Sequence, residues 1–221
     1  MLEADLVKNI NCYLRQNGVL YANESRMGIG IPDITVNFGA NRRMKPLNDY
    51  FLVSILAYID EKKKVTFREI QDTFMLGTEK VKQYVFTLAN LSLVKIKNTI
   101  IQILKNILSI NLGTTISIEA KLKDWKGACL QAQRYLCFSD YSYVALPEET
   151  IKNVDANVFL DSGIGLLSVN GKKLLEVIPA RKSSCEAILK YICTSKVVEK
   201  NSGVEKKHLR PNVFSPILNT P

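Results

Sequence analysis

Two stretches in which apolar and polar residues alternate constrain the fold of this chain most strongly. Ile31–Phe38 and Ile116–Lys123 each direct apolar side chains to one face of an extended strand and polar side chains to the other. Between them, residues 41–111 show helical periodicity followed by two short strand-like runs. Strands and helices that alternate on both sides of such a segment predict one α/β domain, formed by residues 1–40 and 112–196, that is interrupted by an inserted domain at 41–111.

Composition excludes several classes of protein. The 221 residues are 47% hydrophobic and 23% charged, which is typical of a globular chain and not of a fibrous or disordered one. No apolar run approaches the roughly 18 residues that a membrane-spanning helix needs, and the N-terminus does not resemble a signal peptide. We therefore expect a cytoplasmic protein without a membrane partner. From Val197 onward, the Lys, Asn, Ser, Gly and Pro content predicts an extended or disordered tail over 197–221.

Cysteine and histidine usage limits the chemistry. The chain has 5 cysteines, which are far apart, and 1 histidine. An odd number of cysteines without a C-x-x-C pair argues against a disulfide framework and against a zinc site. Any catalysis is therefore expected to depend on carboxylates and lysines.

The inserted segment begins with three predicted helices. The first follows Pro46 and ends before a run of charged residues. Thr66 is expected to cap the second helix, with Glu69 three residues further on at the capping-box position. Gly77 provides a turn, and Thr78 is expected to cap the third helix.

Two β-rich runs follow the third helix. Leu93–Lys97 and Ile100–Leu104 are joined by Asn98 and Thr99, which is a hairpin signal. Three helices and a hairpin, in this order, resemble the winged helix-turn-helix domains, in which the third helix usually enters the major groove of DNA. By that resemblance, the nucleic-acid contacts would come from Lys80, Lys82, Gln83 and Tyr84 on the third helix and from Lys95 and Lys97 on the wing.

Net charge bears on the role of this segment. Residues 41–111 hold 12 Lys and Arg against 6 Asp and Glu, so they carry 6 of the 9 net positive charges. A concentrated basic excess is the expected footprint of a polyanion-binding surface. Winged helices also serve as protein-interaction modules, and these lysines would then form an ordinary solvated face. The local charge favours the nucleic-acid interpretation.

Acidic residues lie on the polar faces of both alternating stretches. Glu119 and Lys121 share the polar face of the later strand, a pair that a solvated edge strand would also explain. Asp33 lies on the polar face of the earlier strand, and a hairpin centred on Gly28-Ile29 would place Glu24 opposite it. Like charges across a hairpin repel unless a cation lies between them. Carboxylates from several strands, without histidine or thiolate, form a ligand set that suits Mg²⁺ or Mn²⁺.

These motifs and their order resemble the PD-(D/E)xK nuclease superfamily. Pro32-Asp33 is followed on a later strand by Glu119-Ala-Lys121. Over about residues 1–40 and 112–180, the predicted order of helix, three strands, helix and strand agrees with the restriction-endonuclease-like fold of that superfamily. The resemblance implies an α/β (α+β) fold, in which a mixed central sheet is flanked by helices and is interrupted after its second strand by the winged helix-turn-helix domain.

The next predicted helix extends the resemblance. Gln131 and Tyr135 fit the Q-x-x-x-Y element that follows the E-x-K strand in the RecB-like branch. By analogy, both residues would border the site, one helical turn apart on the same face. Plain helix packing would explain this pair equally well.

The resemblance implies a metal-dependent deoxyribonuclease that hydrolyses phosphodiester bonds. Asp33 and Glu119 would hold Mg²⁺ or Mn²⁺, with Glu24 as a further acidic ligand and Glu3 as a weaker alternative. Lys121 would orient or deprotonate the attacking water. The alternative is a catalytically inactive nuclease-fold protein that binds DNA or has a regulatory role. The partner is DNA in both cases, and a homodimer stays open because nucleases that cut both strands commonly work as symmetric pairs.

Overall fold

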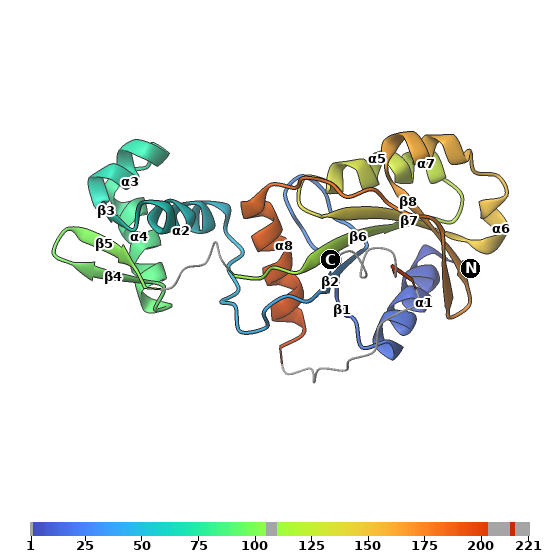
Figure 1. The fold of residues 1–221 in the computed structure, drawn as a ribbon, viewed down its shortest axis with the longest axis horizontal. Coiled ribbons are helices and arrows are strands. Elements are labelled where there is room, and N and C mark those ends of the chain that lie inside the picture. Colours follow the sequence, from blue (N-terminus) through green and yellow to red (C-terminus); the bar gives the residue numbers. More distant parts are fainter. Residues whose placement is uncertain (1, 105–109, 203–212, 215–221) are drawn as a thin grey trace.

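The chain forms an elongated molecule with a large mixed sheet in one part and a small three-stranded sheet at one end (Figure 1). The computed structural model describes residues 2–104, 110–202 and 213–214. Within these ranges it contains eight helices, a 6-stranded sheet and a 3-stranded sheet. The expected mixed α/β architecture is therefore confirmed. None of the helices in the described ranges combines the length and the apolar character that crossing a membrane requires.

The large sheet has the strand order β1-β2-β6-β7-β8-β9. Its central pairs, β6 with β7 and β7 with β8, are parallel, whereas the outer pairs are antiparallel. The two alternating stretches of the sequence correspond to β2 and β6 to within a few residues. The bounds of the strands are Leu20–Asn23 for β1, Ile34–Phe38 for β2, Thr114–Ala120 for β6, Tyr141–Pro147 for β7, Gly165–Asn170 for β8 and Lys173–Ile178 for β9.

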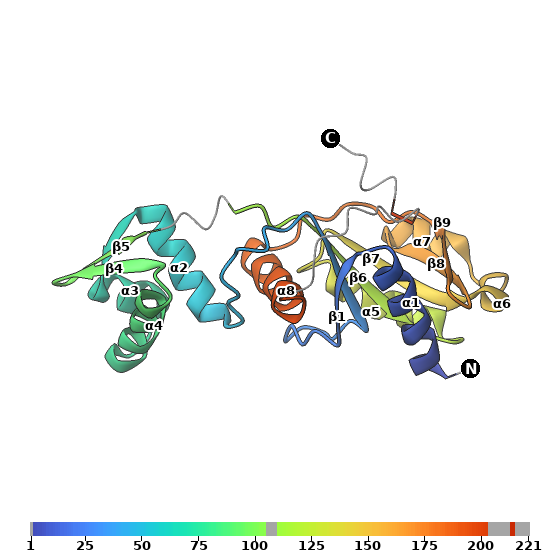
Figure 2. The same ribbon diagram turned by 90° about the horizontal axis from the view of Figure 1, so that it is seen from below.

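Helices cover both faces of this sheet, as the two orthogonal views show (Figures 1 and 2). The apolar stripe of α1 packs against the apolar face of β2 and β6, where Ile116 and Ile118 are fully buried. On the opposite face lie α5 and α8, and the polar side chains of β6 point toward this side. The helices of this part are α1 at Glu3–Gln16, α5 at Trp125–Tyr135, α6 at Glu148–Ile151, α7 at Ala156–Ser162 and α8 at Ala187–Lys200.

The inserted segment forms the small module at one end of the molecule (Figure 1). Its three predicted helices and the hairpin are present, and β3, which the sequence did not predict, completes the antiparallel sheet β3-β5-β4. The two-residue turn of the hairpin places Asn98 in the left-handed region at φ 56°. The bounds are Tyr50–Lys62 for α2, Lys64–Thr66 for β3, Phe67–Phe74 for α3, Thr78–Asn90 for α4, Val94–Lys97 for β4 and Ile100–Ile103 for β5.

The sequence predicts the N-terminal cap of helix α3 correctly but not that of helix α4. Thr66 and Glu69 form the predicted capping box at the start of α3. At the start of α4 the expected cap is wrong, because Gly77 holds the extended backbone of the cap position and Thr78 is already helical. The hydroxyl of Thr78 instead accepts a hydrogen bond of 2.8 Å from the side-chain amide of Gln71 on α3.

Thr66→Ala is expected to lower the free energy of unfolding by about 1 kcal/mol, the usual cost of losing a side-chain N-cap. The hydroxyl of Thr66 accepts the backbone N–H of Glu69 at 3.2 Å, and alanine cannot replace that acceptor. Urea unfolding followed by circular dichroism measures the loss. Thr73→Ala, at an exposed position within the same helix, is the matched control and should not destabilise the protein. Equal effects of the two substitutions would contradict the capping role.

Helix α8 joins the two parts of the molecule. The hydroxyl of Tyr191 donates to the carbonyl oxygen of Lys45 at 2.8 Å, and the hydroxyl of Ser195 accepts from the backbone N–H of Leu47 at 3.2 Å. Apolar residues of α8 and α2, including Ile192 and Leu56, belong to one hydrophobic core. The main chain of the segment that leads into the small module is therefore fixed to α8 by side chains of that helix.

The predicted start of the tail is wrong. Helix α8 continues to Lys200, because Val197 and Val198 are buried at 0% and 5% exposure and extend its packed face. Further along the chain, Phe214 is also buried and contacts the ring of Tyr143 with the ring centroids 5.2 Å apart. The rest of the expected tail, residues 203–212 and 215–221, lies outside the described residues.

Candidate functional site

The structure brings Asp33, Glu119 and Lys121 together at one end of the large sheet. Strands β2 and β6 are antiparallel, so the start of β2 lies beside the end of β6. Asp33 directly precedes β2, and its Oδ2 accepts the backbone N–H of Ala120 at 2.7 Å. The ammonium group of Lys121 lies 3.1 Å from Oε1 of Glu119.

Glu119 is held by Tyr135 of helix α5, which lies on the face of the sheet opposite to α1. The carboxylate is 2% exposed, and its Oε2 accepts the hydroxyl hydrogen of Tyr135 at 2.6 Å. The ring of Tyr135 packs so closely on Gly30 that a Cβ at this glycine would lie 2.7 Å from Cε1 of the ring. The loop before Asp33 and helix α5 therefore fix the Tyr135 ring, and Tyr135 in turn fixes the orientation of Glu119.

Burial raises the pKa of both carboxyl groups. For Asp33, the hydrogen bond from Ala120 and the charge of Lys121 oppose this effect, while Glu3 and Glu24 raise the pKa further. For Glu119, the hydrogen bond from Tyr135 and the charge of Lys121 oppose burial, while the charge of Asp33 adds to it. A cation placed between these groups would favour their ionised forms.

Lys121 stays protonated in this environment. Burial lowers the pKa of its ammonium group, but the hydrogen bond to Glu119 and the charges of Glu119, Asp33 and Glu3 outweigh burial, so the pKa lies above its ordinary value. Oε2 of Glu3, on the first turn of α1, lies 3.4 Å from Nζ of Lys121. Lys121 can therefore donate hydrogen bonds and supply positive charge, but it cannot act as a proton acceptor in this state.

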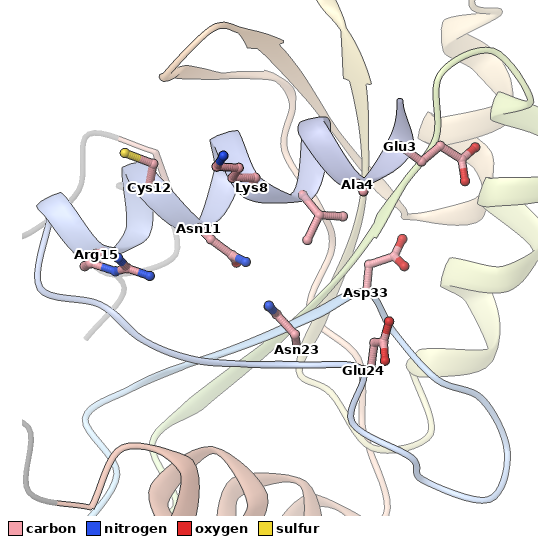
Figure 3. Close-up of a pocket in the computed structure, with 10 residues that line it drawn as sticks. Glu3, Ala4, Lys8, Asn11, Cys12, Arg15, Asn23, Glu24 and Asp33 are labelled. Atoms are coloured by element: carbon pink, nitrogen blue, oxygen red, sulfur yellow. The ribbon is translucent and has the colours of Figure 1, made fainter. Parts of the chain in front are cut away.

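The predicted position of Glu24 is confirmed. Its backbone N–H donates to the carbonyl oxygen of Asp33 at 3.1 Å, which continues the β1–β2 register across the expected hairpin centre. Glu24 has φ 48°, a left-handed conformation that is costly for a residue with a Cβ. Figure 3 shows its carboxylate beside that of Asp33, with Glu3 at the same end of a cavity.

Gln131 does not join the cluster. It lies one turn before Tyr135 on α5 and is half-buried, and no hydrogen bond in the described part of the chain links it to Asp33 or Glu119. Tyr135 thus has a defined contact in the site, whereas the role of Gln131 stays a prediction.

The donor set fits a hard divalent cation with few protein ligands. The carboxylates of Asp33 and Glu119 are close enough for the charge of Asp33 to raise the pKa of Glu119, and oxygen ligands suit Mg²⁺ or Mn²⁺. In the described ranges, no three side chains of His, Cys, Asp and Glu form a complete metal cage, so Glu24 does not close a three-residue group. Mg²⁺ commonly binds through one or two carboxylates and keeps several waters, which this arrangement allows.

The basic residues predicted on the small module are exposed, but two of them have partners. Lys82 forms an ion pair with Glu79 at 2.8 Å, and Lys80 lies over the ring of Tyr84, 5.3 Å from its centroid. Tyr84 is half-buried and stacks on Phe51, which makes it part of the packing of the module. The remaining predicted contacts, Gln83 on α4 and Lys95 and Lys97 on β4, are exposed.

The small module lies at the opposite end of the sheet from the carboxylates. Its two connections leave the sheet beside Phe38 and Thr114, which pair with each other. Asp33 and Lys121 lie at the other ends of the same two strands. Since β6 has 7 residues, about 20 Å of strand separates these ends. The site and the module are therefore not adjacent, and a common substrate must span that distance.

A cavity of about 530 Å³ extends from the carboxylates along α1. One end is acidic, and the rest is lined by polar and apolar side chains of α1 and by Asn23 of β1 (Figure 3). These residues carry no motif in the sequence, although the helix positions among them share one stripe at spacings of three and four residues. The members outside the acidic end are Ala4, Val7, Lys8, Asn11, Cys12, Arg15 and Asn23.

Comparisons with known proteins leave the family of this chain unassigned. No family model and no curated protein matches it. Among solved structures, it is similar to the SPO1766 protein of unknown function from Silicibacter pomeroyi, with 13% identity and a TM-score of 0.47 over 91% of this chain and 87% of that chain. A likeness at this level supports no statement about function.

Proposed function

We propose that the chain is a metal-dependent DNA nuclease, with a core of the restriction-endonuclease-like type and a winged helix-turn-helix domain inserted after its second strand. The convergence of Asp33, Glu119 and Lys121 at one end of β2 and β6 carries this proposal. The hydrogen bonds from Ala120 and Tyr135 hold the two carboxylates in fixed positions. The element order of the small module and the exposure of its lysines support the DNA-binding part.

Each residue of the cluster has a definite chemical role in this proposal. Asp33 and Glu119 would hold Mg²⁺ or Mn²⁺, which when bound polarises the scissile phosphate and lowers the pKa of a water. Lys121, which is protonated, orients the attacking water and offsets the negative charge that builds up on the oxygens of the phosphorane. Tyr135 is a positioning residue that acts through Glu119. The proton of the water passes to solvent or to the phosphate, because Lys121 cannot take it.

The test is a cleavage assay with the purified full chain. Labelled linear duplex, supercoiled, single-stranded and four-way-junction DNA are incubated with Mg²⁺, with Mn²⁺ or with EDTA. We expect cleavage with either metal, none in EDTA, and recovery when excess Mg²⁺ is restored.

Binding without cleavage under every metal would contradict the nuclease proposal. The chain would then be a DNA-binding protein with an inactive nuclease-like core. In that case, binding should collapse when Lys80, Lys82 and Lys95 are replaced together by alanine, because these side chains would supply the phosphate contacts.

A further inference from the structure

The cavity beside α1 has the size and the chemistry to hold one strand of nucleic acid. Its volume of about 530 Å³ lies within the range of about 300–1,000 Å³ that proteins use for small ligands. The stretch of α1 from Glu3 to Arg15 measures about 18 Å, because an α-helix rises about 1.5 Å per residue. A space of this volume is too small to enclose a duplex, but it can hold part of an extended single strand.

The cavity has carboxylates at one end and basic side chains along α1, and the phosphates of a nucleic-acid strand could bind to these basic side chains. The carboxylates of Glu24 and Asp33 lie at one end, where the proposed metal and the reacting phosphate would be. Lys8 and Arg15 follow along α1 and are exposed, so they can contact phosphates further along the strand. The guanidinium group of Arg15 is held over β1 by a hydrogen bond of 3.2 Å from Nη2 to the hydroxyl of Tyr21.

Amide side chains lie between the acidic and basic ends. Asn11 from α1 and Asn23 from β1 point toward one another across the cavity (Figure 3). Oδ1 of Asn11 is buried and has no hydrogen-bond partner among the described residues. A buried acceptor without a partner costs free energy, and an N–H group of a base could satisfy it if the amide of Asn11 turns toward the cavity.

The direction of the cavity fits the position of the small module. Helix α1 begins at the end of the sheet that carries Asp33 and runs back toward the end from which the module leaves. A strand that lies along α1 would therefore lead from the module side to the reacting carboxylates.

We infer that the cavity along α1 binds a single strand of DNA and guides it to the carboxylates, with Lys8 and Arg15 contacting its phosphates. The substrate class is then DNA with a single-stranded segment, such as a free end or a flap. The assignment rests on the proposed function, because it takes the acidic end of the cavity as the reacting end.

The test measures binding and not cleavage. A fluorescent oligo(dT) strand and a fluorescent duplex are titrated in EDTA with wild type and with the Lys8→Ala/Arg15→Ala variant, over a series of salt concentrations. We expect the variant to bind oligo(dT) about tenfold more weakly at low salt, while duplex binding is unchanged. The slope of log K against log salt should fall by about 1.4 for oligo(dT), because each phosphate contact of a single strand contributes about 0.7.

Two control variants show whether the loss of oligo(dT) affinity comes from the position of the two charges, from the change in net charge or from a folding defect. Lys172→Ala/Lys173→Ala removes the same charge at the exposed β8–β9 turn and should bind both probes like wild type. Lys8→Arg/Arg15→Lys keeps both charges in the cavity and should restore the salt slope for oligo(dT). Failure of this charge-preserving variant to restore the slope would overturn the assignment.

The remaining outcomes distinguish this assignment from the nuclease proposal. Equal losses for oligo(dT) and duplex, an unchanged affinity for oligo(dT), or no binding of oligo(dT) by wild type would each overturn the assignment of the cavity. If wild type binds oligo(dT) through Lys8 and Arg15 yet never cuts DNA in Mg²⁺, the nuclease proposal is wrong and the cavity assignment stands. If wild type cuts DNA while the alanine variant binds oligo(dT) normally, only the cavity assignment is wrong.

Discussion

Asp33→Asn is expected to reduce the rate of DNA cleavage by on the order of 10³-fold or more, while DNA binding persists. Asparagine keeps an oxygen that can accept the backbone N–H of Ala120, so the local fold is retained. It lacks the negative charge that would attract a divalent cation. Single-turnover cleavage of labelled DNA in saturating Mg²⁺ measures the effect on the chemical step.

The matched control for this substitution is Asp155→Asn. The side chain of Asp155 also accepts a backbone N–H, that of Asn157 at 3.0 Å, but at the start of α7 and outside the carboxylate cluster. We expect this variant to cleave DNA like wild type. If both variants cleave at the wild-type rate, Asp33 does not hold the metal, and the carboxylate cluster is not the reacting site.

The sequence predicts the carboxylate cluster well because its geometry is decided locally. The β1–β2 hairpin pairs Glu24 with Asp33 through a short connection, so the register follows from the turn. Glu119 and Lys121 share a face because side chains alternate along a strand. The long separation between Asp33 and Glu119 is explained by the insertion, whose own helices and hairpin also follow from local periodicity.

Helix α8 could not be predicted in the same way. The buried residues of α8 include Thr194 and Ser195 as well as Ile192 and Val197. They lie on several sides of the helix, so the sequence shows no amphipathic stripe that would predict it. The hydroxyl of Ser195 is satisfied by the backbone of the segment that leads into the small module, a partner that only the tertiary fold supplies. The cavity beside α1 also depends on tertiary packing, because the stripe of α1 that lines it becomes one wall of a cavity only where the helix packs beside β1 and Asp33.

Lys190 of α8 and Asp140, which directly precedes β7, form a partly buried ion pair that fixes this helix to the sheet. Nζ of Lys190 lies 2.8 Å from Oδ1 of Asp140, and the two side chains are 19% and 8% exposed. Oδ2 of Asp140 accepts the backbone N–H of Thr115 at 2.7 Å, at the start of β6. One carboxylate thus joins α8, β6 and β7 at the end of the sheet from which the small module leaves.

Lys190→Met is therefore expected to lower the free energy of unfolding by about 3 kcal/mol, because it leaves the carboxylate of Asp140 buried without its cation. Urea unfolding followed by the fluorescence of Trp125, which is the 1 tryptophan of the chain, measures the change. Lys82→Met is the matched control. Its ion pair with Glu79 has side chains that are 48% and 86% exposed, so its loss should cost less than about 1 kcal/mol.

The double variant Asp140→Asn/Lys190→Met is expected to recover most of the stability that Lys190→Met loses. It removes the uncompensated charge, and the side-chain oxygen of asparagine still accepts the backbone N–H of Thr115. Recovery would show that the cost of the single variant comes from burying an unpaired carboxylate and not from the packing of α8. A double variant that is less stable than Lys190→Met alone would contradict this account, and the ion pair would then be only one of several contacts that hold α8 on the sheet.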